Sequence, residues 1–292
     1  MSSESPDGDG ERADEQAYEA VVRDGVFRLR RPDTEWLSTG WDGGRETADC
    51  AYNVSVPEGW SRTDLGAYVG ERLERARFSE SGERADGGER LVHRTGSDAP
   101  VLLTGVDLEH ARGARCGSVT AYATAGLSNP AALPMDLDEQ PHPSETASDE
   151  ASADLDPTGT VNVLVGTTRA LAPGALANLV AVVAEAKAAT LLADTGFPGT
   201  TTDAVIVGHD PTGRPAAFTG SGTEIGAAAR ACVREAVRAS LRSRYDAGEA
   251  TIPNSVAEAN DGVSTDVRAD VFRPPTEDGN SGVGSPVDEP DD

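Results

Sequence analysis

Strand-like segments follow one another in runs along this chain, and two long helical segments come only after most of them. Apolar or alternating stretches at 51–56, 101–106, 118–124, 160–166 and 204–208 each have the pattern of a strand. Strands grouped in this way, rather than alternating strictly with helices, favour an α+β fold over a doubly wound sheet. We therefore expect a single layered domain in which helices cover a mixed β-sheet.

The first part of the chain predicts a hairpin followed by a helix. Asp24-Gly25 separates two strand-like segments, Ala17–Val22 and Val26–Leu29, which is a β-hairpin signal. Residues 63–78 have a helical period, with Thr63 as the candidate N-cap. The expected inward stripe of this helix is Leu65, Val69, Leu73 and Ala76.

Three acidic and polar segments lie outside these patterns. They span residues 1–16, 134–158 and 246–292, and they are rich in Asp, Glu, Gly, Ser and Pro. Segments of this composition bury too little apolar surface to offset the entropy of the chain. We expect a disordered N-terminus, a disordered loop inside the domain and a disordered C-terminal tail, which leaves a folded domain over 17–245.

The charge is strongly unbalanced, with 25 Lys and Arg against 50 Asp and Glu and a formal net charge of -25. Such a surface repels phosphate backbones and anionic lipid, so we expect no nucleic acid and no membrane partner. Heavy use of acids with a single lysine, Lys187, fits a cytosol at high salt, where screening reduces self-repulsion. The three widely spaced cysteines and the absence of a signal-like or membrane-spanning segment predict a cytoplasmic protein with reduced thiols.

A helix expected over 175–193 is apolar nearly all round, which indicates a buried helix. Its charges are Glu185 and Lys187, and a buried charge needs a partner. Either both reach a functional site from a central helix, or Lys187 extends towards solvent and Glu185 pairs with an arginine. The first hypothesis gains weight because every other basic residue is arginine, so this position favours a compact, titratable ammonium.

Two Gly/Thr-rich turns each end in an acid, at Gly199–Asp203 and at Gly220–Glu224. The first turn offers three hydroxyls and a carboxylate that could bind a polar substrate or activate water, or it is only a β-branched lead-in to a strand. The second turn opens a helix expected over 224–245, whose N-terminal N–H groups suit a developing oxyanion. Its alternative is a capping box, in which Ser221 and Glu224 satisfy backbone donors. No metal-ligand spacing, phosphate loop or GxSxG motif is present.

Five segments, in this order and spacing, resemble the adenosylcobinamide amidohydrolase family. They are Thr124–Pro130, Gly159–Val163, Glu185–Ala189, Gly199–Ala204 and Gly220–Gly226, with a weaker match at Gly40–Gly44 and Asn53. The resemblance covers about residues 26 to 245. It implies hydrolysis of the amide that joins the aminopropanol arm to the corrin ring of adenosylcobinamide, giving adenosylcobyric acid for adenosylcobalamin synthesis. It also implies a corrinoid substrate as partner and no cofactor, because the cobalt belongs to the substrate.

Amide hydrolysis needs a nucleophile, an oxyanion stabiliser and a proton for the leaving amine. We expect Asp203 or Glu224 to activate a water or a threonine hydroxyl, and Lys187, with Glu185, to supply positive charge or the proton. Free N–H groups at 222–223 would stabilise the oxyanion. The expected substrate-binding residues are Asn129, Asn162, Thr200, Thr201, Thr202, Ser221, Gly222 and Thr223.

Two other function classes use the same features. A non-catalytic corrinoid or small-molecule binding protein would bind without releasing aminopropanol. An acyl transferase acting through the same turns would need an amine acceptor. The sequence leaves open whether the chain forms a homo-oligomer.

Overall fold

The computed structural model describes residues 18–57, 64–78, 99–136, 159–246, 248, 250–259 and 261–274. These residues form a mixed eight-stranded sheet, a three-stranded sheet and three α-helices, which confirms the α+β class. The predictions for residues 1–16, for most of 134–158 and for the end of the tail lie outside the described residues. The disorder expected there stays a prediction.

The large sheet has the strand order β4-β3-β2-β10-β8-β6-β5, with β1 paired to β2 outside this path. Parallel pairing occurs between β3 and β4 and between β8 and β10, and the other neighbours are antiparallel. The strands are β1 Glu19–Arg23, β2 Val26–Ser38, β3 Gly44–Ser55, β4 Val101–Thr104, β5 Arg112–Cys116, β6 Val119–Ala125, β8 Val161–Leu171 and β10 Ala204–Ala216.

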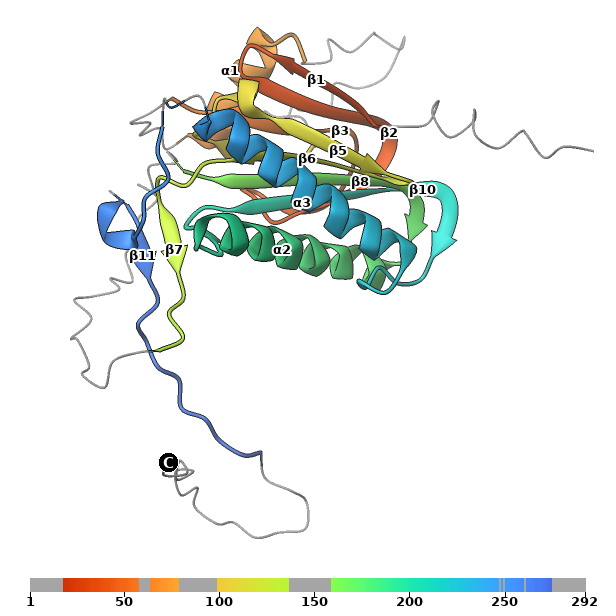
Figure 1. Ribbon diagram of the computed structural model, residues 1–292. Coiled ribbons are helices and arrows are strands. Elements are labelled where there is room, and N and C mark those ends of the chain that lie inside the picture. The colour runs from red at the N-terminus through yellow and green to blue at the C-terminus, as the bar shows by residue number, and fades with distance from the viewer. Residues whose placement is uncertain are drawn as a thin grey trace, which may run out of the picture.

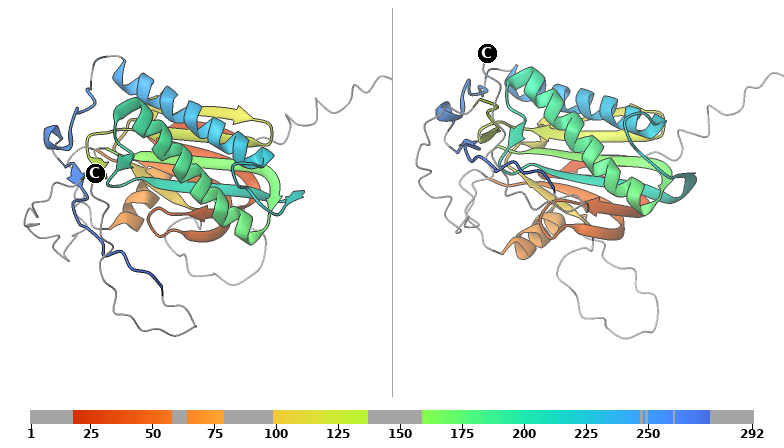
Figure 2. Two further views of the ribbon diagram at one scale, coloured as in Figure 1. Left: turned by 60° about the horizontal axis from the view of Figure 1, so that its bottom comes forward. Right: turned by 90° about the horizontal axis from the view of Figure 1, so that it is seen from below.

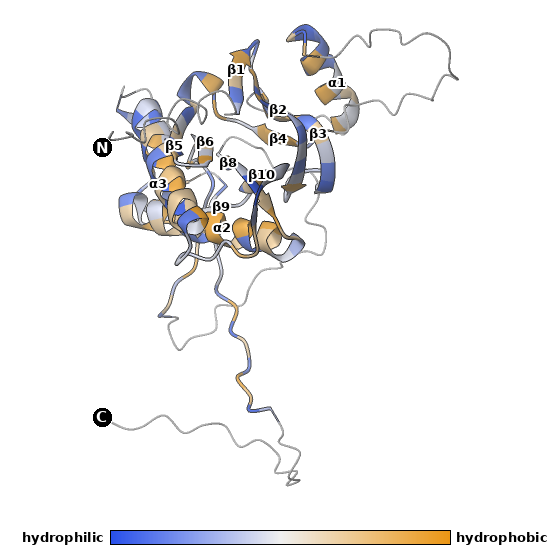
Figure 3. Ribbon diagram, turned by 90° about the vertical axis from the view of Figure 1, so that its right-hand side faces the viewer, coloured by the Kyte–Doolittle hydropathy of each residue, from blue (hydrophilic) through white to orange (hydrophobic). Residues whose placement is uncertain are grey.

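The long strand β2 bends and folds the sheet over on itself. Its pairing with β3 changes register between Arg30 and Thr34, its first half pairs with β1, and its second half pairs with β10. Phe27 of β2 therefore lies against Tyr122 of β6, with ring centroids 5.0 Å apart, although two strands separate β2 from β6 in the sheet. One sheet half, β1–β4, thus packs on the other half, formed by β5, β6, β8 and β10 (Figure 3).

Helices cover the outer faces of both halves, so the domain has four layers (Figure 1). The helix α1 (Leu65–Arg75) packs on β2, β3 and β4, and the helices α2 (Pro173–Thr195) and α3 (Glu224–Tyr245) pack on the other half. Figure 2 shows α2 and α3 lying side by side across that half. Within the described chain, α2 alone is long and apolar enough to cross a membrane, yet half of its apolar window is buried in the fold.

Most long elements form where the sequence predicts them. The hairpin at Asp24-Gly25 has positive φ at both turn residues, 48° and 68°, as a tight hairpin turn requires. The helix α3 spans the predicted 224–245, and α2 is two residues longer at each end. The N-cap of α1 is Asp64, which accepts from the backbone N–H of Ala67 at 2.9 Å, whereas Thr63 lies outside the described residues.

A second, small sheet has the order β11-β7-β9. Its strands are β7 Pro130–Ala132, β9 Gly199–Thr200 and β11 Val263–Ser264. The central strand β7 is antiparallel to β9 and parallel to β11. The sheet therefore joins the residues after 246, which include the short 3-10 helix η2 (Val256–Glu258), to the turn that precedes β10.

Candidate active site

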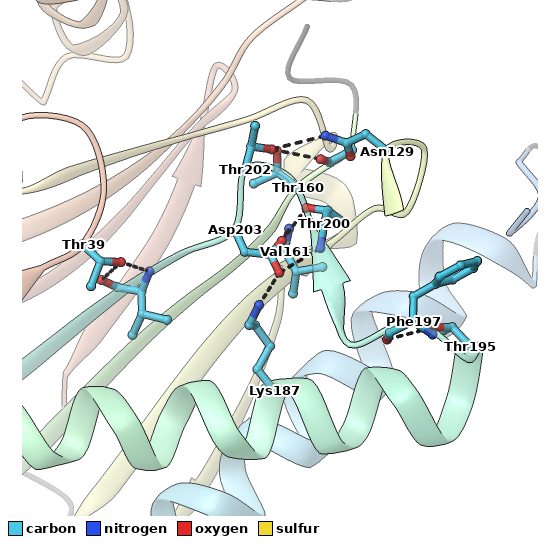
Figure 4. Close-up of polar contacts among 12 residues, drawn as sticks. Thr39, Asn129, Thr160, Val161, Lys187, Thr195, Phe197, Thr200, Thr202 and Asp203 are labelled. Carbon is cyan, nitrogen blue, oxygen red and sulfur yellow. Dashed lines mark hydrogen bonds and ion pairs between the residues drawn. The ribbon is translucent and has the colours of Figure 1, made fainter. Parts of the chain in front are cut away.

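Lys187 of α2 and Asp203, the residue just before β10, form a buried ion pair (Figure 4). The Lys187 Nζ donates a hydrogen bond to Asp203 Oδ2, and the two side chains are only 10% and 11% exposed. Val205 and Val207 face the helices, and side chains alternate along a strand, so Asp203 points to the same side. The sequence placed both residues in the candidate site, and the structure brings them into contact.

Three further donors converge on the Asp203 carboxylate. Oδ1 accepts from the Thr200 hydroxyl at 2.5 Å and from the Val161 N–H at 2.9 Å, and Oδ2 accepts from the Thr200 N–H at 3.1 Å. With Lys187, four donors occupy the roughly four acceptor positions of a carboxylate. In this arrangement the four donors leave no free acceptor position on Asp203, and the carboxylate fixes the positions of Lys187 and Thr200.

Gly199 makes room for this convergence. A Cβ atom at this position would lie 2.6 Å from Asp203 Oδ2 and 3.3 Å from Lys187 Nζ. Real Cβ atoms essentially never approach a neighbour within 3.0 Å, so any side chain here would displace the carboxylate. The glycine of this turn is therefore part of the geometry of the ion pair.

A second cluster joins hydroxyl and carboxamide groups at the same end of the sheet. The Asn129 Nδ2 donates to Thr201 Oγ1 at 2.6 Å, and the Thr202 hydroxyl donates to the Gly159 carbonyl at 3.1 Å. The hydroxyls of Thr160 and Thr202 lie 2.9 Å apart. Asn129 Oδ1 is buried and accepts no hydrogen bond within the described chain, which leaves one acceptor free beside the threonines.

Asn162, a substrate-binding residue in the prediction from the sequence, lies on the other side of β8. Its Nδ2 donates to Asn53 Oδ1 at 3.0 Å and to the Leu103 carbonyl at 2.8 Å, and Asn53 in turn donates to Thr124 at 3.0 Å. Asn162 is fully buried, and these bonds join β3 and β4 to β6 and β8. Asn162 therefore links the two sheet halves. The sequence could not show this, because the pattern of one strand does not reveal which other strands its side chains contact.

The two acids outside this cluster lie elsewhere. Glu185 is 63% exposed and lies 3.3 Å from Arg230 of α3, so it pairs with an arginine as the alternative predicted, whereas Lys187 stays buried. Glu224 is 73% exposed and lies 3.6 Å from Arg169. Asp203 precedes β10 and Glu224 follows it, so the 13 residues of that strand separate the two acid-ended turns.

The turn before α3 is a helix cap, but it is not a capping box formed by Ser221 and Glu224. Thr223 is the N-cap, and its hydroxyl accepts from the Gly226 N–H at 3.0 Å. Glu224 is the first helical residue, so it cannot reach back as the third helical residue does in a capping box. The Thr223 N–H donates to the Gly220 carbonyl at 2.8 Å and is not free for an oxyanion, while Ser221 and Gly222 are exposed.

Lys187, Asn129 and the threonines at 160 and 200–202 thus bring together an ammonium, a carboxamide and several hydroxyls at the ends of strands. Among the described residues, no group of three or more His, Cys, Asp or Glu is placed to hold a metal ion. Donors of this kind bind carbonyl and amide groups and can stabilise negative charge that develops on oxygen. Fold and site thus define the class: an α+β protein with a candidate polar site, built from an ammonium, hydroxyls and a carboxamide at the ends of strands.

Comparison with known proteins assigns the family within this class. Residues 88–249 match the family model described as adenosylcobinamide amidohydrolase. An adenosylcobinamide amidohydrolase of Halobacterium salinarum is 53% identical over 257 residues, which are 88% of this chain and 100% of that protein. One of Methanosarcina mazei is 28% identical over 222 residues, 73% of this chain and 92% of that protein. The chain belongs to the adenosylcobinamide amidohydrolase family, as the resemblance of its motifs predicted.

A solved structure, that of the PH0078 protein from Pyrococcus horikoshii OT3, matches more weakly. It is 12% identical, with a TM-score of 0.36 over 76% of this chain and 78% of that chain. A likeness at this level says nothing about the activity of the chain.

Proposed function

We propose that this protein hydrolyses the amide between the aminopropanol arm and the corrin ring of adenosylcobinamide. Water adds its oxygen to the amide carbon, the C–N bond breaks, and the nitrogen takes a proton, which gives adenosylcobyric acid and 1-aminopropan-2-ol. Membership of the family supports this proposal, and the buried Lys187–Asp203 pair is the observation in the structure that supports it most directly. The cobalt is part of the substrate, so the proposal includes no separate cofactor.

Lys187 is the proposed electrostatic group of the reaction. An ammonium has three N–H donors, and Asp203 is its one partner within the described chain, so two donors remain for the oxygen of the scissile amide. A buried ammonium stabilises a developing oxyanion more strongly than one in water, because the local dielectric is low. Asp203 is then a positioning residue that fixes the ammonium, and water is the proposed nucleophile.

The threonine and asparagine cluster is the proposed binding site for amide groups of the corrinoid. Asn129 Oδ1 is the free acceptor, and the hydroxyls of Thr201, Thr202 and Thr160 lie beside it. Corrinoids present several carboxamides, which both donate and accept hydrogen bonds. Asn162 and the turn at 221–223 are left out of this proposal because they lie on the far side of β8 and beyond the other end of β10.

The test is mass spectrometry of adenosylcobinamide after incubation with the protein at high salt. Wild type is expected to release 1-aminopropan-2-ol over many turnovers, and Lys187→Met is expected to lower kcat at least 100-fold, about 2.7 kcal/mol of transition-state stabilisation. Glu185→Gln and Glu224→Gln are the matched controls, because both side chains are exposed. These controls are expected to stay within about threefold of wild type.

Three outcomes would contradict the proposal in different ways. Stoichiometric binding without release would show a corrinoid-binding protein. Release that requires an added amine would show an acyl transferase. A transient mass increase of the protein by the corrinoid acid would show an acyl-enzyme in place of direct attack by water.

We also propose a cytoplasmic location, with neither nucleic acid nor a membrane as partner. The net charge of -25 supports this, because so acidic a surface is repelled by phosphate groups. Light scattering of the purified protein at high salt would determine whether it forms a homo-oligomer.

A further inference from the structure

Exposed apolar side chains gather where the chain leaves the small sheet β11-β7-β9. Most large apolar side chains of the described residues are buried, and more than half of the exposed ones occur on two short segments. These are Leu133 and Met135 after β7, and Val263, Val267, Val271 and Phe272 on and after β11. Met135, Val271 and Phe272 are 79%, 90% and 81% exposed, an unusual degree of exposure for side chains of this size.

The two segments run side by side. Val263 and Ser264 pair in parallel with Ala131 and Ala132, and the Thr265 N–H donates to the Ala132 carbonyl at 3.1 Å. Because the pairing is parallel, both chains leave the sheet at the same end and in the same direction (Figure 1). We call residues 133–135 together with 263–272 the apolar arm.

The apolar arm is continuous with the candidate active site. The strand β7, from which one half of the arm emerges, also pairs with β9, where Pro130 lies opposite Thr200. The Thr201 N–H donates to the carbonyl of Asn129, the residue just before β7, at 3.2 Å. A single small sheet therefore links the arm to the turn whose Thr200 hydrogen-bonds Asp203.

We propose that the apolar arm binds the corrin macrocycle of the substrate while the amide to be cleaved lies at Lys187. This inference rests on the proposed function. The Lys187 and Asp203 side chains are only 10% and 11% exposed, so a macrocycle cannot lie directly on the pair and must lie outside, against neighbouring surface. A corrin ring presents methyl and methylene groups on both faces, and these gain free energy when they cover exposed apolar side chains.

The test compares two triple variants at exposed positions. Val267→Ser/Val271→Ser/Phe272→Ser is expected to raise KM for adenosylcobinamide about tenfold or more and to leave kcat within about twofold, because uniform binding is lost. The matched control is Val21→Ser/Val22→Ser/Leu192→Ser, at side chains 37%, 47% and 54% exposed on β1 and α2, and its KM is expected to stay at the wild-type value. Both variants change exposed positions, so both are expected to keep the wild-type unfolding midpoint.

A second measurement separates this inference from the proposed function. Absorbance titration of wild type and of the arm variant with adenosylcobinamide gives Kd without need for turnover. If wild type binds but releases no aminopropanol, the proposed function fails, while a tenfold weaker Kd of the variant still supports the arm. An unchanged KM and Kd in the arm variant would overturn the inference. If light scattering shows that wild type is an oligomer and that the arm variant binds normally but is a monomer, the arm is an interface with a second copy, and the inference is also overturned.

Discussion

Lys187 and Asp203 bury opposite charges against each other, and removing one leaves the other buried without a partner. Loss of one member of such a pair typically costs about 3–5 kcal/mol. We therefore expect Lys187→Met and Asp203→Asn each to lower the free energy of unfolding by about that amount. The double variant is expected to recover most of the loss, because it contains no unpaired charge. Urea unfolding at one fixed high salt concentration gives the four values of this cycle.

The activity of the double variant separates chemistry from stability. It is expected to fold almost as stably as wild type and to remain inactive, because the proposed oxyanion stabiliser is missing. Wild-type turnover by this variant would show that the pair serves only the fold.

Gly199 allows a second test, in which no charge is removed. Gly199→Ala places a Cβ 2.6 Å from Asp203 Oδ2, so we expect the carboxylate to shift, with a cost of about 1–3 kcal/mol in stability and a lower kcat. Gly70→Ala is the matched control, since nothing lies within 4 Å of its Cβ inside α1 and alanine favours a helix by up to about 1 kcal/mol. Thermal unfolding and a turnover assay report both effects. Equal behaviour of the two variants would contradict the close packing at Gly199.

At the scale of residues, the sequence grouped Lys187 with Asp203, and the two side chains are in contact, but it could not separate Lys187 from Glu185. Glu185 and Lys187 are two positions apart on the helix, so their side chains differ by about 200° in direction and point to nearly opposite sides. The helix is apolar on both sides, and the pattern therefore gave no sign of which side faces the sheet. Only the packing of α3 shows that Glu185 lies next to Arg230.

The N-terminus of α3 shows how an element is fixed by one residue. The Thr223 hydroxyl both donates to the Gly220 carbonyl at 2.8 Å and accepts from the Gly226 N–H at 3.0 Å. Thr223→Ala is expected to lower the free energy of unfolding by about 1 kcal/mol, the usual value of an N-cap. Ser221→Ala is expected to stay within about 0.5 kcal/mol of wild type, because Ser221 is exposed and outside the cap. A larger loss for Ser221→Ala than for Thr223→Ala in urea unfolding would restore the capping box.

Long elements could be predicted from the sequence because their period repeats over several turns or strand pairs. The short strands β7, β9 and β11 could not, because each has only two or three residues and forms through a partner far away in the chain. The pairing of β7 with β9, for example, joins residues around 130 to residues around 200. The link between the apolar arm and the active site therefore appears only in three dimensions.

For the molecule as a whole, the bend of β2 determines the four-layer arrangement, and the sequence does not show it. The change of register between Arg30 and Thr34 includes Asp33, whose φ is 54°, and it places Arg31 beside Asp210 of β10. The side chains of this ion pair are 13% and 11% exposed. It thus joins the two sheet halves at the fold between them, where no local pattern marks a strand that turns from one half to the other.

Asp210 makes the stability of this fold depend on pH. Burial alone would raise the pKa of Asp210, but hydrogen bonds from Thr212 and from Arg31 outweigh it and hold the pKa below its ordinary value. A carboxyl group with a lowered pKa in the folded state stabilises the fold above its unfolded pKa, about 3.9, and this contribution disappears as the pH falls through the folded value. Asp210→Asn is therefore expected to be about 1–3 kcal/mol less stable than wild type at pH 7, because Arg31 loses a charged partner.

The difference between wild type and Asp210→Asn is expected to shrink as the pH falls below about 4 and to vanish once Asp210 is protonated in the fold. The many other carboxylates titrate alike in both proteins, so subtracting the two curves isolates Asp210. Urea unfolding from pH 7 to pH 2 at constant high salt measures both curves, and Glu185→Gln, at an exposed ion pair, is the control. A difference that stays constant over this range would show that the Arg31–Asp210 pair contributes through packing and not through its charge.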